Sequence, residues 1–171
     1  RRCSFAVGTD APYTGGRRPP TRSSVGIDRA SVIRCKPFPP VVVANAGPAG
    51  SGDFALLLTA TGAVVGAGGK LVVNNVQPRW QGNYTAAFIT GIMVDVRNLG
   101  SFDLNVRVAI DGPLVGATGG RWVSLDVLLP ASSGWRTLTF SLLPEDLLPG
   151  DFAATDPKAT RANVGVLRIM H

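Results

Sequence analysis

Apolar and polar side chains alternate strictly along four segments of this chain, and this two-residue rhythm constrains the fold more than any other feature. The segments are Ile92–Asn98, Leu104–Asp111, Val123–Leu128 and Arg136–Leu142. Successive side chains of a β-strand point to opposite faces of a sheet, so alternation places one face against a core and leaves the other in water. The pattern predicts half-buried strands and a protein that presents a surface.

Further strands are predicted where short apolar runs lie between Gly-rich or polar turns. In chain order the predicted strands are Val41–Val43 at an edge, Phe54–Ala60, Lys70–Asn75, Thr85–Asn98, Asp103–Asp111, Arg121–Leu129, Arg136–Leu142 and Asn163–Met170. We expect one helical turn at Pro144–Leu148 and a loop at Asp151–Ala162. Many short strands separated by turns are typical of an all-β sandwich or barrel.

The first 44 residues differ from the rest in composition, being rich in Gly, Pro, Arg and Ser. Residues 1–40 hold eight basic and two acidic groups, which accounts for the whole net charge of +6, whereas residues 41–171 hold nine of each sign. We therefore predict an irregular basic segment at 1–44 and a sandwich domain at 45–171. Three interpretations of the basic segment stay open: a solvated tail, an arm that neutralises nucleic-acid phosphates, or a spurious extension of the reading frame. No Lys/Arg run exceeds two residues, so nucleic acid is not the expected partner.

Both cysteines, Cys3 and Cys35, lie in the basic segment and would form a disulfide only in an oxidising compartment. Their number and spacing indicate no metal site. The longest apolar stretch, Phe54–Gly69, is too short and too Gly-rich for a membrane span. Because the chain begins at Arg1, either a leader has been removed or the chain is a fragment. Because it ends directly on a predicted strand, we expect that one closing strand is missing.

The alternation also assigns faces to the predicted strands. In Val123–Leu128, residues Val123, Leu125 and Val127 are assigned to the core. The residues assigned to the wet face of the four segments include Asp95, Arg97, Asn105, Arg107, Asp111, Trp122, Ser124, Asp126 and Thr139. If these strands are neighbours, most of these side chains form one face whose planar polar groups and indole suit the hydroxyls and C–H groups of sugars. The alternative is that opposite charges across strands simply stabilise an exposed sheet.

A second candidate site is the loop Gln77–Tyr84, which gathers two aromatic and several polar side chains. Trp80, Asn83 and Tyr84 would form a binding rim there, because loops on a rigid scaffold often carry function. In the alternative interpretation, Trp80 and Tyr84 plug the end of the sandwich. Asn83-Tyr84-Thr85 also fits an N-glycosylation sequon, which matters only in a glycosylating secretory pathway.

Catalytic motifs are missing from the sequence. His171 is the only histidine and lies at the end of the chain, which makes a Ser-His-Asp or Cys-His arrangement implausible. Gly62–Lys70 resembles a phosphate-binding loop but has Val64 and Leu71 where that motif needs Gly and Ser or Thr. A glycosidase would need two carboxyl groups in one cleft, and Asp95 and Asp126 would serve if they shared a face. Both are expected to be solvent-exposed, so we do not expect an enzyme.

Several segments together resemble a known family. They are Gly52–Leu56, Trp80–Tyr84, Asp95–Leu99, Leu104–Arg107, Gly134-Trp135 and Leu167–His171. In their order and spacing they are similar to the galactose-binding-like jelly-roll domains of secreted bacterial proteins, including carbohydrate-binding-module-like domains of PEP-CTERM-sorted proteins. The resemblance covers about residues 45–171.

The resemblance implies a two-sheet antiparallel β-sandwich of the jelly-roll type, export to the cell surface or medium, and non-catalytic binding of a glycan or cell-surface polymer. Relatives usually continue into a final strand with an aspartate associated with a structural calcium. That strand is absent here, so the resemblance carries no calcium site over, and no cofactor is expected. Two other functions stay open: a capsid-like jelly roll with a nucleic-acid-binding arm, and a jelly-roll glycoside hydrolase. The sequence leaves the oligomeric state open.

Overall fold

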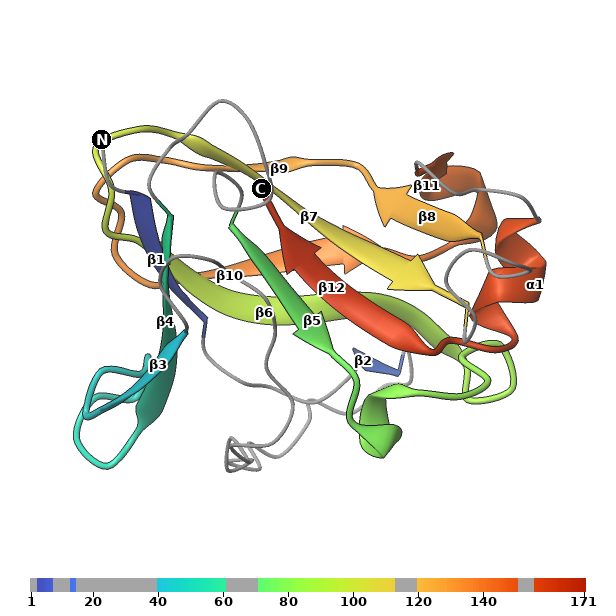
Figure 1. Cartoon of the computed structure of the whole chain (residues 1–171), viewed down its shortest axis with the longest axis horizontal. Coiled ribbons are helices and arrows are strands. Elements are labelled where there is room, and N and C mark those ends of the chain that lie inside the picture. The colour runs from blue at the N-terminus through green and yellow to red at the C-terminus, as the bar shows by residue number, and fades with distance from the viewer. Residues whose placement is uncertain (1–2, 8–12, 15–39, 61–70, 113–119, 151–155) are drawn as a thin grey trace.

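The fold is all-β, and its strands form two antiparallel sheets that pack face to face (Figure 1). A computed structural model describes residues 3–7, 13–14, 40–60, 71–112, 120–150 and 156–171. Each sheet has six strands in this part of the chain. A sandwich-type architecture is therefore confirmed, whereas the jelly-roll connectivity stays a prediction.

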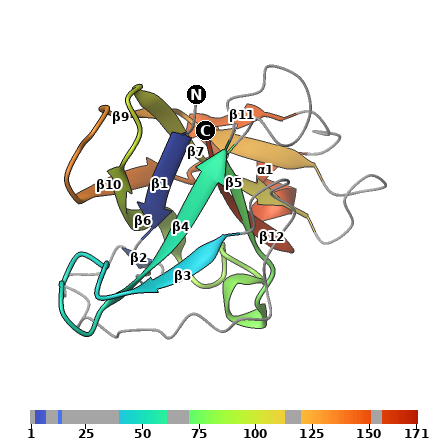
Figure 2. The same ribbon diagram turned by 60° about the vertical axis from the view of Figure 1, so that its left-hand side comes forward.

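The first sheet, here called the β6 sheet after its long central strand, has the order β10-β6-β1-β4-β3, and β2 also pairs with β6. Its strands are β1 (Cys3–Val7), β2 (Tyr13–Thr14), β3 (Val41–Ala44), β4 (Phe54–Ala60), β6 (Ile89–Asn98) and β10 (Arg136–Ser141). Figure 2 shows β1, β4 and β3 lying side by side at one side of the molecule. Residues 1–44, which we expected to be irregular apart from Val41–Val43, thus contribute three strands.

The second sheet, here called the β7 sheet, has the order β11-β8-β7-β12-β5, and β9 also pairs with β7. Its strands are β5 (Val72–Asn75), β7 (Leu104–Asp111), β8 (Arg121–Ser124), β9 (Val127–Leu129), β11 (Leu147–Pro149) and β12 (Val166–Met170). The one α-helix among the described residues, α1 (Pro157–Arg161), leads into β12. Two 3-10 turns, η2 (Pro78–Trp80) and η3 (Pro144–Asp146), complete the elements.

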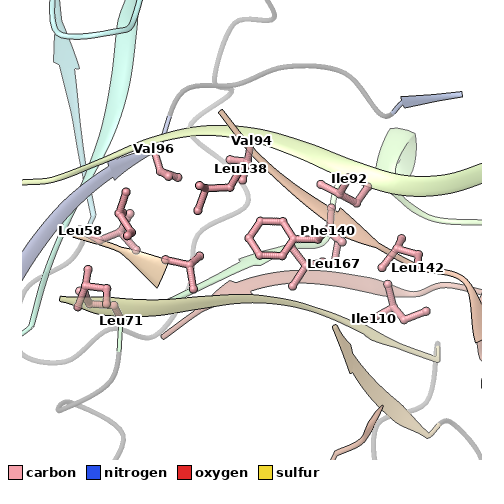
Figure 3. Close-up of a cluster of buried hydrophobic side chains, with 14 of the residues drawn as sticks. Leu58, Leu71, Ile92, Val94, Val96, Ile110, Leu138, Phe140, Leu142 and Leu167 are labelled. Atoms are coloured by element: carbon pink, nitrogen blue, oxygen red, sulfur yellow. The ribbon is translucent and has the colours of Figure 1, made fainter. Parts of the chain in front are cut away.

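The core lies between the two sheets and is built from the inward residues of the alternating strands (Figure 3). Val94 and Val96 of β6 face inward, as do Val108 and Ile110 of β7, and the ring of Phe140 lies in the middle of this cluster. Phe140 is 1% exposed and Ile110 is fully buried. Burying one such side chain contributes about 1.5–3 kcal/mol to the free energy of folding. Because the alternating strands supply most of the buried side chains, this burial is the main source of the fold's stability.

Most of the predicted strands are present, and beyond residues 1–44 four differences stand out besides small shifts of strand ends. The strand predicted at Thr85–Asn98 begins at Ile89, and Leu147–Pro149 forms an unpredicted strand after the 3-10 turn. The loop predicted at Asp151–Ala162 contains α1, because Asp156 caps it by accepting a hydrogen bond from the Lys158 N–H at 3.0 Å and Pro157 pre-sets its first residue.

The fourth difference is that the strand predicted at Arg121–Leu129 is broken into β8 and β9. At the break, inward and outward positions are exchanged. Val106 lies opposite Val127, and Ala109 lies opposite Val123. The four residue steps from Val123 to Val127 therefore lie opposite only three residue steps of β7. One extra residue at Leu125–Asp126 acts as a β-bulge, and a one-residue shift turns every side chain to the other face. The inward assignment of Val123 and Leu125 was therefore wrong, while that of Val127 is confirmed.

Candidate functional site

The loop residues predicted as a rim divide into a buried plug and an exposed turn. Tyr84 is 3% exposed, and its hydroxyl donates a hydrogen bond to the Trp80 carbonyl at 2.6 Å. Burial raises the pKa of Tyr84 to about 12, because the phenolate would lose its hydration. Trp80 is half-buried and packs against the core. Both aromatics close the end of the sandwich and offer a ligand little polar surface.

Asn83 is exposed, but its side-chain oxygen is already used within the loop. It accepts a hydrogen bond from the Ala86 N–H at 2.8 Å, which caps a single turn that ends at Phe88. Phe88 has a φ of 55°, and the Ile89 N–H reaches back to the Tyr84 carbonyl at 2.9 Å, as at the end of a helix. The three predicted rim residues thus have local structural partners rather than convergent free groups.

The predicted sheet-face residues lie on two different sheets, so the expectation of one shared face was wrong. Asp95, Arg97 and Thr139 belong to the β6 sheet, whereas Asn105, Arg107 and Asp126 belong to or adjoin the β7 sheet. Asp95 and Asp126, which would have served a glycosidase only if they shared a face, are separated in the same way.

Trp122 and Ser124 are also absent from the wet face, because the bulge turns both inward. Trp122 lies opposite Ile110 and packs against the core. Ser124 is 2% exposed, and its hydroxyl oxygen accepts a hydrogen bond from the Val108 N–H at 3.0 Å. The sequence could not reveal this, since Trp122 and Ser124 fit the polar half of the alternation.

The two charged candidates that the sequence placed on the β6 sheet, Asp95 and Arg97, are largely covered. Asp95 is 8% exposed, contrary to expectation, and accepts a short hydrogen bond from the Thr137 hydroxyl on the neighbouring strand. Arg97 is half-buried, and no hydrogen-bond acceptor reaches its buried Nε within the described part of the chain. Thr137 and Thr139 of β10 are exposed beside them. This face offers hydroxyl groups but no accessible charge pair.

The β7 sheet carries a buried ion cluster, here called the Asp111 clamp and formed by Asp111, Arg121, Arg168 and Asn74. Asp111 is 1% exposed; its Oδ1 accepts from Arg121 Nε at 2.8 Å and its Oδ2 from Arg168 Nε at 2.7 Å. Arg168 Nη1 in turn donates to Asn74 Oδ1 at 2.6 Å. The clamp joins β5, β12, β7 and β8. Because the Arg168 guanidinium already donates hydrogen bonds to the Asp111 carboxylate, we interpret the clamp as structural.

Next to the clamp, the same outer face carries three of the predicted candidates in the open. Asn105, Arg107 and Asp126 are all exposed. Arg107 Nη2 lies 4.0 Å from Asp126 Oδ2, and the two side chains are 48% and 45% exposed. Asn105 and Arg107 occupy alternate positions of β7, so their side chains point to the same side.

Apolar side chains flank these polar groups. Leu128 lies opposite Asn105 and is 55% exposed, and Met170 lies opposite Arg107 and is half-buried. His171 adjoins them, because its Nδ1 accepts a hydrogen bond from the Asn105 N–H at 3.2 Å. We call Asn105, Arg107, Asp126 and Leu128 the open face. It combines planar donors and acceptors with an apolar platform on strands that the core holds rigid.

Metal chemistry finds no support in the described ranges, where no three His, Cys, Asp or Glu side chains gather to hold an ion. In the same ranges no helix has the length and hydrophobicity needed to cross a membrane. The disulfide between Cys3 and Cys35 that an oxidising compartment would allow lies outside the described residues, since Cys35 is not among them. Comparison with family models, curated proteins and solved structures finds no match to this chain.

The Asp111 clamp is the main feature that sequence reasoning missed. Asp111 was assigned correctly to the outer face, but nothing in the sequence shows that β12 lies beside β7 and β5 beside β12. Arg168 stands in a predicted strand and Arg121 at the start of another, so the signal was one arginine in each of the two strands that flank β7, although the unseen bulge hid the outward position of Arg121.

Proposed function

We propose that this chain is a non-catalytic binding module that recognises carbohydrate through the open face of the β7 sheet. One observation carries the proposal: Arg107 and Asp126 stand 4.0 Å apart with half of each side chain exposed, beside Asn105 and an exposed leucine. The resemblance to secreted bacterial carbohydrate-binding domains points the same way and adds that the protein acts outside the cell or on its surface.

The separation of the two charges matters because it leaves their hydrogen-bonding capacity available. At 4.0 Å the Arg107–Asp126 pair is too long for a hydrogen bond, and exposed pairs of this kind contribute about 0–1 kcal/mol. A sugar hydroxyl both donates and accepts, so adjacent hydroxyls can donate to the Asp126 carboxylate and accept from the Arg107 guanidinium. The Asn105 amide adds one acceptor and two donors on the same side.

The apolar flank supplies the second half of sugar recognition. The C–H groups of a sugar ring need an apolar surface, and Leu128 and Met170 border Asn105 and Arg107. Because all these side chains stand on or beside paired strands, little ordering is needed when a ligand binds.

A glycan array probed with the intact protein tests the proposal, followed by calorimetric titration with the glycan that gives the strongest signal. Arg107→Ala and Asp126→Ala should each weaken binding about 10- to 100-fold, because each removes a charge-assisted hydrogen bond. Arg136→Ala is the matched control, since Arg136 is exposed but belongs to the β6 sheet. Absence of any glycan binding, or an equal loss in the control, would refute the proposal.

A further inference from the structure

Arg161, at the end of α1, is a buried cation that has no carboxylate partner among the described residues. The residue is 8% exposed, and its Nη2 donates a hydrogen bond to the Ile89 carbonyl at 3.0 Å. Its Nε is buried and meets no acceptor, and no salt bridge within the described ranges involves this guanidinium. A backbone carbonyl is a dipole and carries no net charge, so the cation stays without a counter-ion.

Two other buried arginines show how this chain usually treats such a charge. The side chains of Arg121 and Arg168 are each 16% exposed, and both reach the carboxylate of Asp111. Arg97 also has a buried Nε without an acceptor, but that residue is only half-buried and stays partly hydrated. Burying a guanidinium is costly unless an opposite charge offsets it, and a buried group left unpaired indicates a functional site or a bound ion.

The chain around Arg161 supplies positive charge and no free carboxylate. Lys158 is exposed and stands three residues earlier on α1, which places its side chain on the same side of the helix. Asp156 is the only acidic residue from 152 to 171, and its carboxylate accepts the Lys158 N–H at 3.0 Å. The facing turn, where the Tyr84 N–H donates to the Arg161 carbonyl at 2.9 Å, lies in a stretch without acidic residues, 70–94. An anion from outside the chain would therefore complete this cluster.

An anion can reach the guanidinium from the surface. Nε is the only nitrogen of Arg161 that is buried without an acceptor, so Nη1, which makes no hydrogen bond within the described chain, is open to solvent. In Figure 1, α1 lies at the right-hand edge of the molecule. The open face lies at the far end of β12, where Met170 pairs with Arg107, so the two sites are separate.

We propose that Arg161 and Lys158 bind an oxyanion group, a carboxylate or a phosphate, at this end of the sandwich. A guanidinium holds the oxygens of such a group through parallel N–H donors, and the Lys158 ammonium adds a second positive charge from the surface. The bound anion neutralises the buried charge that the fold itself leaves unpaired. The site does not depend on the function proposed for the open face.

Thermal unfolding of the intact protein at constant ionic strength tests the proposal, with inorganic phosphate and acetate as probes and chloride as the reference ion. At about ten times its dissociation constant, a bound probe should raise the unfolding midpoint of the wild type by about 3–6 °C. Arg161→Met should lose this shift. Because the substitution also removes an uncompensated charge, its midpoint in chloride should equal or exceed that of the wild type, whereas Arg121→Met should lower the midpoint and keep the shift.

Lys158→Ala adds a variant that leaves the core untouched, since Lys158 is exposed. It should weaken binding of the probe about 3- to 10-fold in calorimetric titration, and Arg136→Ala on the β6 sheet is the matched control that should not. A shift with phosphate alone assigns a phosphate group, and a shift with acetate alone assigns a carboxylate. Absence of a shift with both probes, or a shift that survives in Arg161→Met, would overturn the proposal. So would an Arg161→Met protein destabilised as much as Arg121→Met, because the charge would then serve the fold.

Discussion

The outer faces of the two sheets carry the same kinds of charged side chains but differ in how accessible those side chains are. On the β6 sheet, Asp95 is covered and held by Thr137. On the β7 sheet, Asp111 is covered still more completely, whereas the side chains of Arg107 and Asp126 stay about half exposed and lie 4.0 Å apart. Partnered polar groups therefore stabilise this fold, whereas groups left in water without a close partner keep their hydrogen-bonding capacity.

The largest effect should come from the Asp111 clamp. Asp111→Ala leaves the Arg121 and Arg168 guanidinium groups without their carboxylate, and breaking a buried pair costs about 3–5 kcal/mol. Asp126→Ala, on the same sheet and beside another arginine, should cost less than about 0.5 kcal/mol. Urea unfolding of both variants measures the contrast. Equal losses would erase the distinction between partnered and open charges.

A pH-dependent effect of intermediate size should come from Tyr84 at the end of the sandwich. Burial raises its pKa to about 12 from 10.0, so the unfolded chain loses this proton at a lower pH than the folded chain does. The stability contribution is fully present below pH 10 and is lost as pH rises to about 12, by about 2–3 kcal/mol. The difference in stability between the wild type and Tyr84→Phe should therefore change by about 2–3 kcal/mol across this range, to the disadvantage of the wild type. Parallel curves would show that Tyr84 is not buried as described.

Thr137→Val should have a smaller effect on the β6 sheet. The substitution keeps the shape of the side chain but removes the hydroxyl that donates to Asp95, which leaves a covered carboxylate with one partner fewer. We expect a loss of about 1–2 kcal/mol in the free energy of unfolding. Thr139→Val, on the same strand and also exposed, is the control and should be nearly neutral. A neutral Thr137→Val would mean that Asp95 needs no partner.

The smallest effect should be the coupling between Arg107 and Asp126. A double-mutant cycle with alanine at both positions should give an interaction energy below about 0.5 kcal/mol, because the pair is long and exposed. A coupling above about 1 kcal/mol would mean that the pair is part of the fold's stability, and the contrast with the Asp111 clamp would be lost.

The sequence was sufficient for the architecture wherever the alternation was unbroken. Phe54–Ala60 was predicted with its observed bounds, and the inward residues of β6, β7 and β10 were assigned correctly. It failed where one residue is inserted, at Leu125–Asp126, since a period of two carries no information about a change of phase. It also missed β1, whose five residues stand in a segment otherwise rich in Pro, Gly and Arg.

The candidate site was predicted in part, and for a physical reason. The sequence identified Asn105, Arg107 and Asp126 as outward polar residues, but strand order decides which outward residues share a face, and strand order is set by the packing of the whole chain. For the same reason Asp95 was grouped with residues of the opposite sheet. The open face and the clamp differ in the solvent exposure of their side chains. That exposure depends on which strands are neighbours, and the sequence does not determine the strand order.

We propose above all that ligand binding occurs on the open face of the β7 sheet. Nuclear magnetic resonance of the isotopically labelled protein, titrated with the glycan selected on the array, tests it most directly. We expect chemical-shift changes at Asn105–Arg107, Asp126–Leu128 and Met170, with Asp95, Arg97 and Thr137 unmoved. Shift changes centred on the outer face of the β6 sheet, or on the loop at Trp80–Tyr84, would contradict the claim.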